Sequence, residues 1–502
     1  MTKDTFYKNS ILLTLTNLFT GILKFVFAIF LSRKLGPEGM GLYGLIMPIY
    51  DLFCCIINGG MITAMSKECA SYAANDDYRN INKTVHTALL FEVFWSIVMA
   101  AVLVLSSRFI SVYILKDIRA ISSLRFISIA VIFVAVGSIL KGYYFGTAKA
   151  EVPAIIDIFE KSIRIIAVTS IITILAITSI EKAVTATYAS LAIGEVVSFT
   201  FLFIFYKLVS SKRKGKNSNC RVESSPQILF NIWAIALPLS INGFLTTAIS
   251  GFSKLMIPMR LTAAGFTHSE ALALIGKFSE MAMTIVFFPM IVIMSVSIIL
   301  IPDLSRSAAE KNYYKMEHRV KEVLTLAFLL GVCILLISIT MPDSLTYLLF
   351  KRTDLSKYLI LAAVGAPLMY VSMTTYGILN GFGKQKIVLK NSIITALLQL
   401  ILCFSLIGIN WINIYGYGIA MVVSSIVGLI LNMREIQKHI YIGIDIGNLL
   451  IYLAVAALSF YLIKVMLYVI PNSIGAFKIP FICLAGIFIF FFGCYKLKKK
   501  EG

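Results

Sequence analysis

Three charged residues, Asp157, Glu160 and Arg164, stand three and four positions apart within a long apolar stretch. On an α-helix, residues at these spacings share one face. Charges at membrane depth cost roughly 2.5–3.5 kcal/mol each on insertion scales and usually face a bundle interior or a water-filled cavity. A guanidinium is well shaped for two-point contact with a phosphate. This stripe therefore predicts a cavity that binds an anion. The alternative is a Glu160–Arg164 ion pair that only neutralises the helix for insertion.

Three further charges within apolar stretches each have two interpretations. Lys24 and Asp51 either contribute to the same polar cavity or neutralise each other between the first two helices. Glu280 either has a functional role or pairs with Lys277, one turn away. The spacing of these residues leaves both interpretations open.

Cations near the predicted outer ends of helices are also candidates. Lys254 and Arg260 either bind the anion or extend their charged heads to the membrane interface. The complete set of predicted substrate-binding residues is Arg164, Glu160, Lys24, Asp51, Lys254, Glu280, Arg33 and Arg260.

The elements that hold these charges follow from composition. The chain has 502 residues, 59% of them hydrophobic and 14% charged, and its mean hydropathy is +0.89. This composition excludes a soluble globular domain with an ordinary surface. It predicts an all-α polytopic membrane protein, because about fourteen apolar stretches have roughly the ~20 residues that cross a bilayer. The predicted spans are 9–31, 42–66, 84–106, 120–146, 153–178, 184–209, 228–255, 271–301, 320–341, 357–380, 387–409, 412–433, 446–469 and 478–496. Kinks are expected at Pro48, Pro238, Pro289 and Pro367.

Motifs of nucleotide hydrolysis and zinc catalysis are absent from the sequence. It contains no GxGxxG, GxxxxGK[ST] or HExxH pattern. The eight cysteines lie mostly inside apolar stretches without a CxxC pair, so we interpret them as small core residues. We therefore predict a protein that is not an enzyme and needs no metal or cofactor. Any transport is passive or coupled to an ion gradient, and the sequence leaves H⁺ and Na⁺ both open.

Loop charges predict the orientation in the membrane. With the N-terminus inside, the inner loops carry 26 of the Lys and Arg residues that we count and the outer loops carry 11. Basic loops favour the cytoplasmic side, so we predict a cell-membrane protein whose N- and C-termini are both cytoplasmic. The net charge of +20 suits an anionic leaflet or an anionic substrate. No polar domain exists to bind nucleic acid.

An internal repeat is also visible. Gly, Gly and Lys at positions 142, 146 and 149 recur at 377, 381 and 384, each 235 positions later. Because both copies end the fourth span of a half, we predict two six-helix lobes related by a parallel repeat. The predicted division is an N-terminal lobe over 1–210, a basic cytoplasmic linker over 211–227, a C-terminal lobe over 228–440 and two extra helices over 441–502.

Ordered glycine and proline motifs carry a family resemblance. They are RKLGPEGMGLY at 33–43, GYYFG at 142–146 followed by Pro153, IPMRLTAAGFTHSEALALIGKFSEMA at 257–282, IPDLS at 301–305, NGFGK at 380–384 and IYG at 414–416. In order and spacing the chain resembles the stage V sporulation protein B family. This family lies in the polysaccharide branch of the multidrug, oligosaccharidyl-lipid and polysaccharide (MOP) exporter superfamily and is related to lipid II flippases. The resemblance covers nearly the whole chain.

The resemblance implies flipping of polyprenyl-pyrophosphate-linked saccharides, here a lipid II-like peptidoglycan precursor for the spore cortex. It also identifies Glu160 and Arg164 with the family's Glu and Arg. The positions that depart from the family pattern are Ala28 for an Arg, with Lys24 one turn earlier, Lys141 for an Arg, Asn380 for a Gln and Glu280 for a Gly.

We predict that two lobes enclose a cationic cavity and move by alternating access. Arg164, Lys24 and Lys254 bind the pyrophosphate, while Glu160 and Asp51 hold these cations in place. The last two helices form a groove for the lipid tail. The partners implied are the glycolipid, membrane lipids and cell-wall synthesis enzymes. Two other classes stay open: a cation-coupled multidrug exporter of the same superfamily, and a non-transporting scaffold that recruits cell-wall enzymes.

Overall fold

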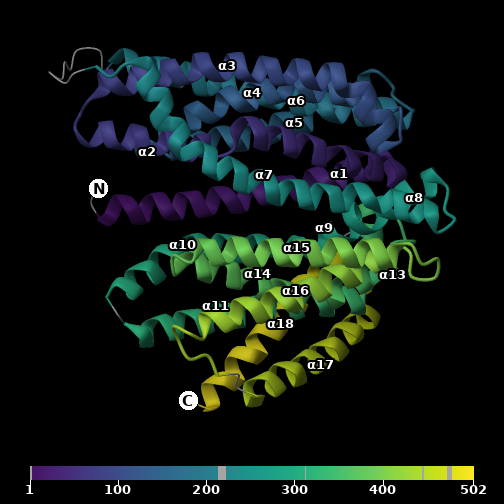
Figure 1. The fold of residues 1–502 in the computed structure, drawn as a ribbon. Helices are drawn as coiled ribbons and strands as arrows, with labels where there is room; N and C mark the ends of the chain where they lie inside the picture. Colours follow the sequence, from purple (N-terminus) through teal and green to yellow (C-terminus); the bar gives the residue numbers. More distant parts are fainter. Residues whose placement is uncertain (1–2, 213–221, 311, 444–445, 472–476, 502) are drawn as a thin grey trace. The chain divides into compact units, whose positions relative to one another are not determined.

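The computed structural model describes residues 3–212, 222–310, 312–443, 446–471 and 477–501. Within these ranges the elements are helices and no strand occurs, which confirms the predicted all-α class (Figure 1). A bilayer offers no water to the backbone, so apolar segments of this length satisfy their N–H and C=O groups within helices. The helices are α1 Lys3–Asn58, α2 Met61–Ala74, α3 Tyr78–Phe109, α4 Ala120–Gly146, α5 Glu151–Ile174, α6 Ile180–Lys212, α7 Ser225–Ala263, α8 His268–Ile275, α9 Met283–Phe287, α10 Met290–Ala309, α11 Tyr313–Thr340, α12 Pro342–Phe350, α13 Ser356–Val364, α14 Ala366–Gly381, α15 Gln385–Ile407, α16 Tyr415–Ile436, α17 Ile446–Val469 and α18 Lys478–Glu501, with π-helical segments η1 Ile110–Leu115 and η2 Gly276–Ala282.

The predicted count of fourteen spans is not reached. By length and composition, the described residues contain ten helices able to cross a membrane, or up to twelve when two bent pairs each count as one span. Two predicted spans fall in the single stretch Thr14–Ala74, and α5 is not among the ten, since five of its residues are charged. The bent pairs turn by 52° between α9 and α10 and by 48° between α13 and α14, next to Pro289 and Pro367. Both proline kinks were expected.

The chain divides into two compact units. Unit 1 comprises Met1–Phe27 and Leu42–Met256, and unit 2 comprises Ala28–Gly41 and Ile257–Gly502. In unit 1, α4 is the central helix and packs against α2, α3 and α6, while α5 packs against α6. In unit 2, α14 packs against α10, α11 and α16, and α15 packs against α16. The contacts thus match in order: α2, α3, α4, α5 and α6 correspond to α10, α11, α14, α15 and α16. A parallel repeat requires such a correspondence.

Two small residues on α4 let it approach α2 closely. A Cβ on Gly142 would stand 2.5 Å from the Cβ of Met65, and a Cβ on Gly146 would stand 2.5 Å from the carbonyl oxygen of Ser66. Real Cβ atoms do not come this close to such neighbours, so the backbones can pack at this distance only without side chains. The first copy of the repeated Gly-x-x-x-Gly motif is therefore a helix-packing site.

The helix α1 is interrupted at Gly36, whose φ of 66° and ψ of −178° are not helical. It ends at Asn58, and α2 begins at Met61 after Gly60, which adopts φ 75°. The predicted span 42–66 is therefore wrong at its end, because it continues through this break. The break packs against α7: a Cβ on Gly60 would stand 2.7 Å from the Cβ of Leu239, and Ser240 donates a hydrogen bond to the carbonyl of Gly59.

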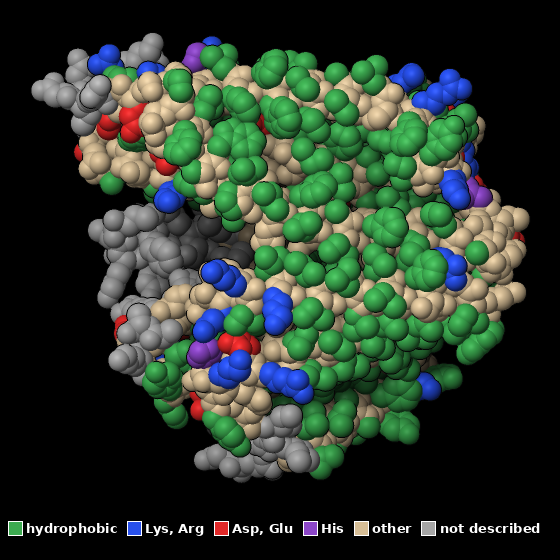
Figure 2. Space-filling view, in the orientation of Figure 1, with side chains coloured by type: hydrophobic (Ala, Val, Ile, Leu, Met, Phe, Trp, Pro, Cys, Tyr) green, Lys and Arg blue, Asp and Glu red, His purple; other side chains and the backbone are tan. Residues whose placement is uncertain are grey.

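The surface agrees with a lipid environment. On the face that Figure 2 draws, hydrophobic side chains cover the middle stretches of the helices, and Lys and Arg gather toward helix ends. The predicted domain boundaries stay a prediction, and residues 213–221 of the predicted linker lie outside the described residues. The helices α17 and α18 pack against each other and both contact α11 in unit 2.

Candidate functional site

Four helices of unit 1 bring seven charged residues within electrostatic reach of one another. We name this set the charged cluster, and its members are Lys24 of α1, Lys141 of α4, Asp157, Glu160, Lys161 and Arg164 of α5, and Glu195 of α6. Lys24 interacts electrostatically with the four α5 residues, and Glu195 interacts with Glu160, Lys161, Lys141 and Arg164. Four cations face three carboxylates, so the cluster carries one excess positive charge when all members are ionised.

Glu160 lies at the centre of the cluster and is only 2% exposed. Its Oε2 accepts a hydrogen bond from Nζ of Lys161. Its Oε1 is buried with no hydrogen-bond partner in the described part of the chain. Gly194 of α6 provides the room for this carboxylate, since a Cβ there would stand 2.8 Å from Oε1. The alternative of a Glu160–Arg164 ion pair is therefore wrong, because the adjacent lysine takes that position.

The guanidinium of Arg164 is held by aromatic side chains. Its Cζ lies 4.7 Å from the ring centroid of Phe27, and its Nη2 donates a hydrogen bond of 3.4 Å to the hydroxyl of Tyr43. Tyr43 is held in turn by Tyr188, whose hydroxyl donates to the Tyr43 carbonyl oxygen at 2.8 Å. Among the described residues Arg164 forms no ion pair, and its Nε is buried without a hydrogen-bond partner. Stacking fixes the plane of the guanidinium while leaving N–H donors available for an anion.

A second ion pair crosses between helices of the cluster. Nζ of Lys141 on α4 donates to a carboxylate oxygen of Asp157 on α5 at 2.8 Å. Asp157 was predicted to share the stripe, and Lys141 was noted only where the chain departs from the family pattern. Lys161 was missed altogether, although it lies in the same apolar stretch as Glu160 and could have been found by the same depth criterion.

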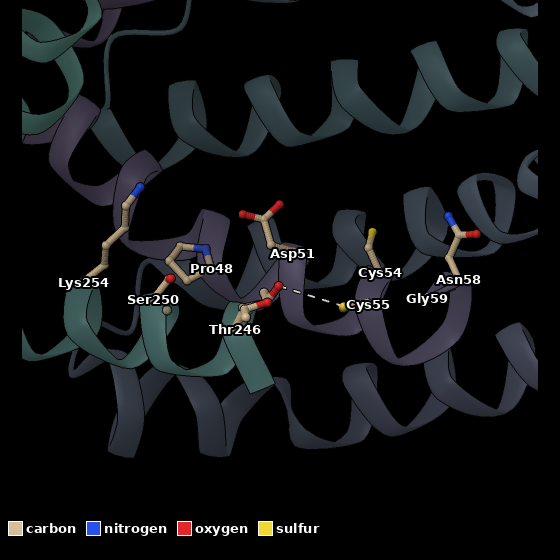
Figure 3. Close-up of a pocket in the computed structure, with 11 residues that line it drawn as sticks. Pro48, Asp51, Cys54, Cys55, Asn58, Gly59, Thr246, Ser250 and Lys254 are labelled. Atoms are coloured by element: carbon tan, nitrogen blue, oxygen red, sulfur yellow. Dashed lines mark hydrogen bonds between the residues drawn. The ribbon is translucent and has the colours of Figure 1, made fainter. Parts of the chain in front are cut away.

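A cavity of about 580 Å³ lies beside the cluster in unit 1, between the second half of α1 and α7 (Figure 3). Asp51 and Lys254 line it, and Lys254 is the charged residue that acts electrostatically on Asp51. Lys24 instead acts together with the α5 charges. The predicted alternative of a Lys24–Asp51 pair is therefore wrong.

The remaining walls of this cavity present both polar and apolar groups. The polar residues besides Asp51 and Lys254 are Cys54, Cys55, Asn58, Thr246, Thr247 and Ser250. Thr247 donates a hydrogen bond to the sulfur of Cys55 at 3.9 Å, and the side-chain oxygen of Asn58 is buried without a partner in the described structure. Glu195 of the cluster acts electrostatically on Tyr50 and Cys54 of α1. This face of α1 therefore connects the cavity with the charged cluster.

Three predicted site residues belong to unit 2 and have contacts of their own there. Arg33 donates hydrogen bonds of 2.6 Å to the carbonyl oxygens of Leu348 and Leu349 at the end of α12. The guanidinium of Arg260 stacks on Phe404, with its Cζ 4.2 Å from the ring centroid. These contacts occupy part of both side chains within the fold, and their predicted role toward a substrate stays a prediction.

Glu280, the third of these residues, lies in η2 with Lys277. Lys277 forms an ion pair of 2.8 Å with Asp354, and the alternative of a Glu280–Lys277 pair stays a prediction. Asp354 also accepts hydrogen bonds from Arg352 at 2.8 and 2.9 Å. These bonds, followed by the effect of Lys277, hold the pKa of the Asp354 carboxyl below its usual range. In the described ranges no three His, Cys, Asp or Glu side chains group as a metal site would require.

Comparisons with known proteins agree with this architecture. A family model described as "Polysaccharide biosynthesis protein" matches residues 6–308, and a model described as "MatE" matches residues 238–405. The chain is 24% identical over 455 residues to stage V sporulation protein B of Bacillus subtilis (strain 168), covering 91% of this chain and 88% of that protein.

Solved structures share the fold at low sequence identity. The lipid II flippase MurJ in an inward closed conformation superposes with a TM-score of 0.72 at 14% identity, covering 98% of this chain and 99% of that one. A multidrug resistance MATE family transporter of the MOP superfamily, in an inward-facing conformation, superposes with a TM-score of 0.66 at 16% identity, covering 86% and 98%.

Proposed function

The chain belongs to the polysaccharide biosynthesis protein family, and on that premise we propose that it is a membrane flippase for a polyprenyl-pyrophosphate-linked saccharide. The saccharide is a lipid II-like peptidoglycan precursor, and the similarity to a sporulation protein supports a role in the spore cortex. The protein moves the headgroup from the cytoplasmic to the outer leaflet of the cell membrane by alternating access, with both termini in the cytoplasm.

The observation that carries this proposal is Arg164. Its guanidinium is stacked on Phe27, has a buried Nε without a partner and forms no ion pair among the described residues. A planar guanidinium of this kind is suited to two-point binding of a phosphate oxygen pair. Lys24 interacts electrostatically with Arg164 and supplies a second cation. In the ion pairs Lys161–Glu160 and Lys141–Asp157, each lysine is compensated by its carboxylate. A pyrophosphate would compensate the positive charges of Arg164 and Lys24.

The neighbouring cavity supports saccharide binding. Hydroxyl groups of Thr246, Thr247 and Ser250 and the amide of Asn58 can donate to and accept from sugar hydroxyls. Lys254 lines the same cavity and can bind the phosphate, and Asp51 would hold the Lys254 side chain in place. The volume of about 580 Å³ is within the range of small-molecule sites.

A groove in unit 2 supports the binding of the lipid tail. It has a volume of about 310 Å³ and lies between α11, α17 and α18, with Leu326, Leu329, Tyr452 and Phe491 among its lining residues. An isoprenoid chain is wholly apolar, so a mainly apolar groove along the two additional helices is a suitable surface for it.

The test is flipping of a fluorescent polyprenyl-pyrophosphate saccharide in proteoliposomes that contain equal amounts of wild type or variant. Arg164→Ala is expected to reduce the flipping rate at least tenfold, and Arg164→Lys is expected to recover part of it. The matched control is Arg125→Ala, which removes an exposed arginine of α4 outside the cluster and should leave the rate unchanged. Equal rates for Arg164→Ala and Arg125→Ala, or no flipping by the wild type, would refute the proposal.

A second candidate is a cation-coupled multidrug exporter, which the MatE match over residues 238–405 favours. The excess positive charge of the cluster argues against it, because cationic drugs would be repelled. Under this alternative, the wild type would accumulate or release a cationic dye in an ion-dependent manner and would show no glycolipid flipping. The same proteoliposomes can measure both activities, so the two candidates are separable.

A further inference from the structure

A second polar cavity lies in unit 2, where the ends of four helices meet. It has a volume of about 530 Å³, and its polar lining consists of Thr340 from α11, Ser344 from α12, Lys464 and Tyr468 from α17, and Lys478 from α18. Two of these groups are cations and three carry hydroxyls, and none of the described lining residues is a carboxylate. Such a donor-rich, positively charged set is suited to an anion with several oxygen atoms.

Lys464 is unusual in its helix. It is the single charged residue in the sequence of α17, and it lies five residues before Val469, or about 7.5 Å from the helix end. Its Nζ lies 4.7 Å from the ring centroid of Phe460, one turn earlier. A lysine at this depth can simply extend to the interface. Here, however, a second lysine and three hydroxyls from other positions converge on the same cavity.

The N-terminal turns of two helices also border this cavity. Ser344 lies in the first turn of α12, whose first intrahelical backbone bond runs from Leu345 N–H to the Met341 carbonyl. The amides of the preceding residues therefore have no acceptor within the helix. Lys478 is the first residue of α18, so the N-terminal turns of two helices border the cavity. Asp343, the acidic residue of the α12 first turn, instead accepts a hydrogen bond from Ser356. The dipoles of α12 and α18 therefore favour an anion here, while the C-terminal turns of α11 and α17, which also border the cavity, oppose it and leave the two lysines as the main source of positive potential.

The floor of the cavity is apolar. Leu467 and Ile479 line it and also pack against a buried cluster formed by Met341, Ile463 and Ile482. A phosphate group bound to the lysines would thus have hydrocarbon surface directly beside it. This combination fits a ligand with a phosphate at the membrane interface and acyl chains alongside.

We propose that this cavity is a binding site for the phosphate group of an anionic lipid headgroup. Lys464 and Lys478 neutralise the phosphate, while Ser344 and Tyr468 supply hydroxyl donors to its oxygens; the hydroxyl of Thr340 already donates to the Leu336 carbonyl oxygen. In the topology predicted from loop charges, the site faces the outer leaflet. The site does not depend on the proposed function, because its residues are not part of the charged cluster and a non-transporting protein could bind lipid equally.

The experiment measures retention of 1-palmitoyl-2-oleoyl phosphatidylglycerol against phosphatidylcholine by the full-length protein, using native mass spectrometry from detergent. The Lys464→Gln/Lys478→Gln double variant is expected to lose selectivity for phosphatidylglycerol at least tenfold. Lys464→Arg/Lys478→Arg keeps both charges and should retain it. Retention in this conservative variant shows that charge, rather than an intact fold alone, determines binding.

The chain offers a matched control in Lys496. Its Nζ lies 5.2 Å from the ring centroid of Phe492, the same one-turn pairing that Lys464 makes with Phe460. Lys496→Gln should leave selectivity unchanged, since Lys496 lines no part of this cavity. If the double variant and Lys496→Gln lost selectivity for phosphatidylglycerol equally, the proposal would be overturned. Lysines at the interface would then attract anionic lipid without a specific site. A titration with inorganic phosphate distinguishes a lipid headgroup from the free anion as the source of the bound phosphate. If the lipid stays bound, the site recognises the headgroup; if millimolar phosphate displaces it, the site binds the free anion. Either result supports a phosphate site.

Discussion

Glu160 is paired with Lys161, its neighbour in the chain, while Arg164, one turn further along α5, stacks on Phe27. This relationship gives Lys161 and Arg164 different roles. Lys161 compensates the buried carboxylate, and Arg164 keeps donors for another group. The excess positive charge of the cluster therefore resides on side chains that can reach an anion.

Removing Lys161 should destabilise the protein. In Lys161→Gln the carboxylate of Glu160, which is 2% exposed, loses its direct cationic partner, and breaking a buried pair in this way costs about 3–5 kcal/mol. The apparent melting temperature in detergent should fall clearly. Glu160→Gln/Lys161→Gln removes both charges and should recover most of the loss. A double variant as unstable as the single one would contradict the pairing.

Substitution of Gly142 should disrupt the contact between α4 and α2. A Cβ at this position would stand 2.5 Å from the Cβ of Met65, so Gly142→Ala is expected to destabilise the fold by about 1–3 kcal/mol through overpacking. Gly137→Ala is the control on the same helix, because the nearest neighbour of a Cβ at this position would be Leu202 Cδ1, at 3.9 Å. Thermal unfolding of both variants in detergent provides the measurement. If Gly142→Ala and Gly137→Ala unfolded at the same temperature, α2 would be able to move away from the added Cβ without a loss of stability.

A buried hydrogen-bond chain should stabilise unit 2. The amide of Asn391 donates to the side-chain oxygen of Asn432 at 2.8 Å, and the amide of Asn432 donates to the hydroxyl of Thr375 at 2.8 Å. Thr375→Val leaves the Asn432 donor without this acceptor, and we expect a loss of about 0.6–1.7 kcal/mol. Thr374→Val is the neighbouring control, since that hydroxyl bonds to the Tyr370 carbonyl within its own helix. The two variants should differ in unfolding temperature, and a difference of zero would contradict an interhelical role.

Stability should depend on pH through Asp354. Hydrogen bonds from Arg352 and the nearby Lys277 lower the pKa of this carboxyl below its ordinary value of 3.8. A group whose pKa is lowered by folding stabilises the fold above its unfolded pKa, and the contribution is lost as pH falls through the folded pKa. Wild type should therefore unfold at a higher temperature than Asp354→Asn at about pH 6, and the difference should shrink below about pH 4. A difference that stays constant across this range would exclude the carboxylate as its source.

Several features of the fold could be predicted from local sequence. Apolar stretches long enough to cross a bilayer predicted the helices, and Pro289 and Pro367 predicted the two sharp bends, because proline removes a backbone donor and clashes with the preceding turn. The repeated glycines predicted two related lobes, and their first copy, Gly142 and Gly146, lies where α4 contacts α2 closely. The end of the second span was not predictable, because the Gly59–Gly60 break depends on its contact with α7.

The depth of the charged residues in apolar stretches could be determined from the sequence by itself, and the cost of isolated charges in lipid requires them to be clustered or compensated. Only the tertiary structure decided which charges meet. Lys141 reaches Asp157 across two helices, Lys24 lies with the α5 charges instead of Asp51, and Lys277 pairs with Asp354, which is distant from it in the chain. The physical reason is that such pairings depend on the rotation and separation of packed helices, which arise from contacts distant in the chain, whereas burial depth depends on local hydropathy alone.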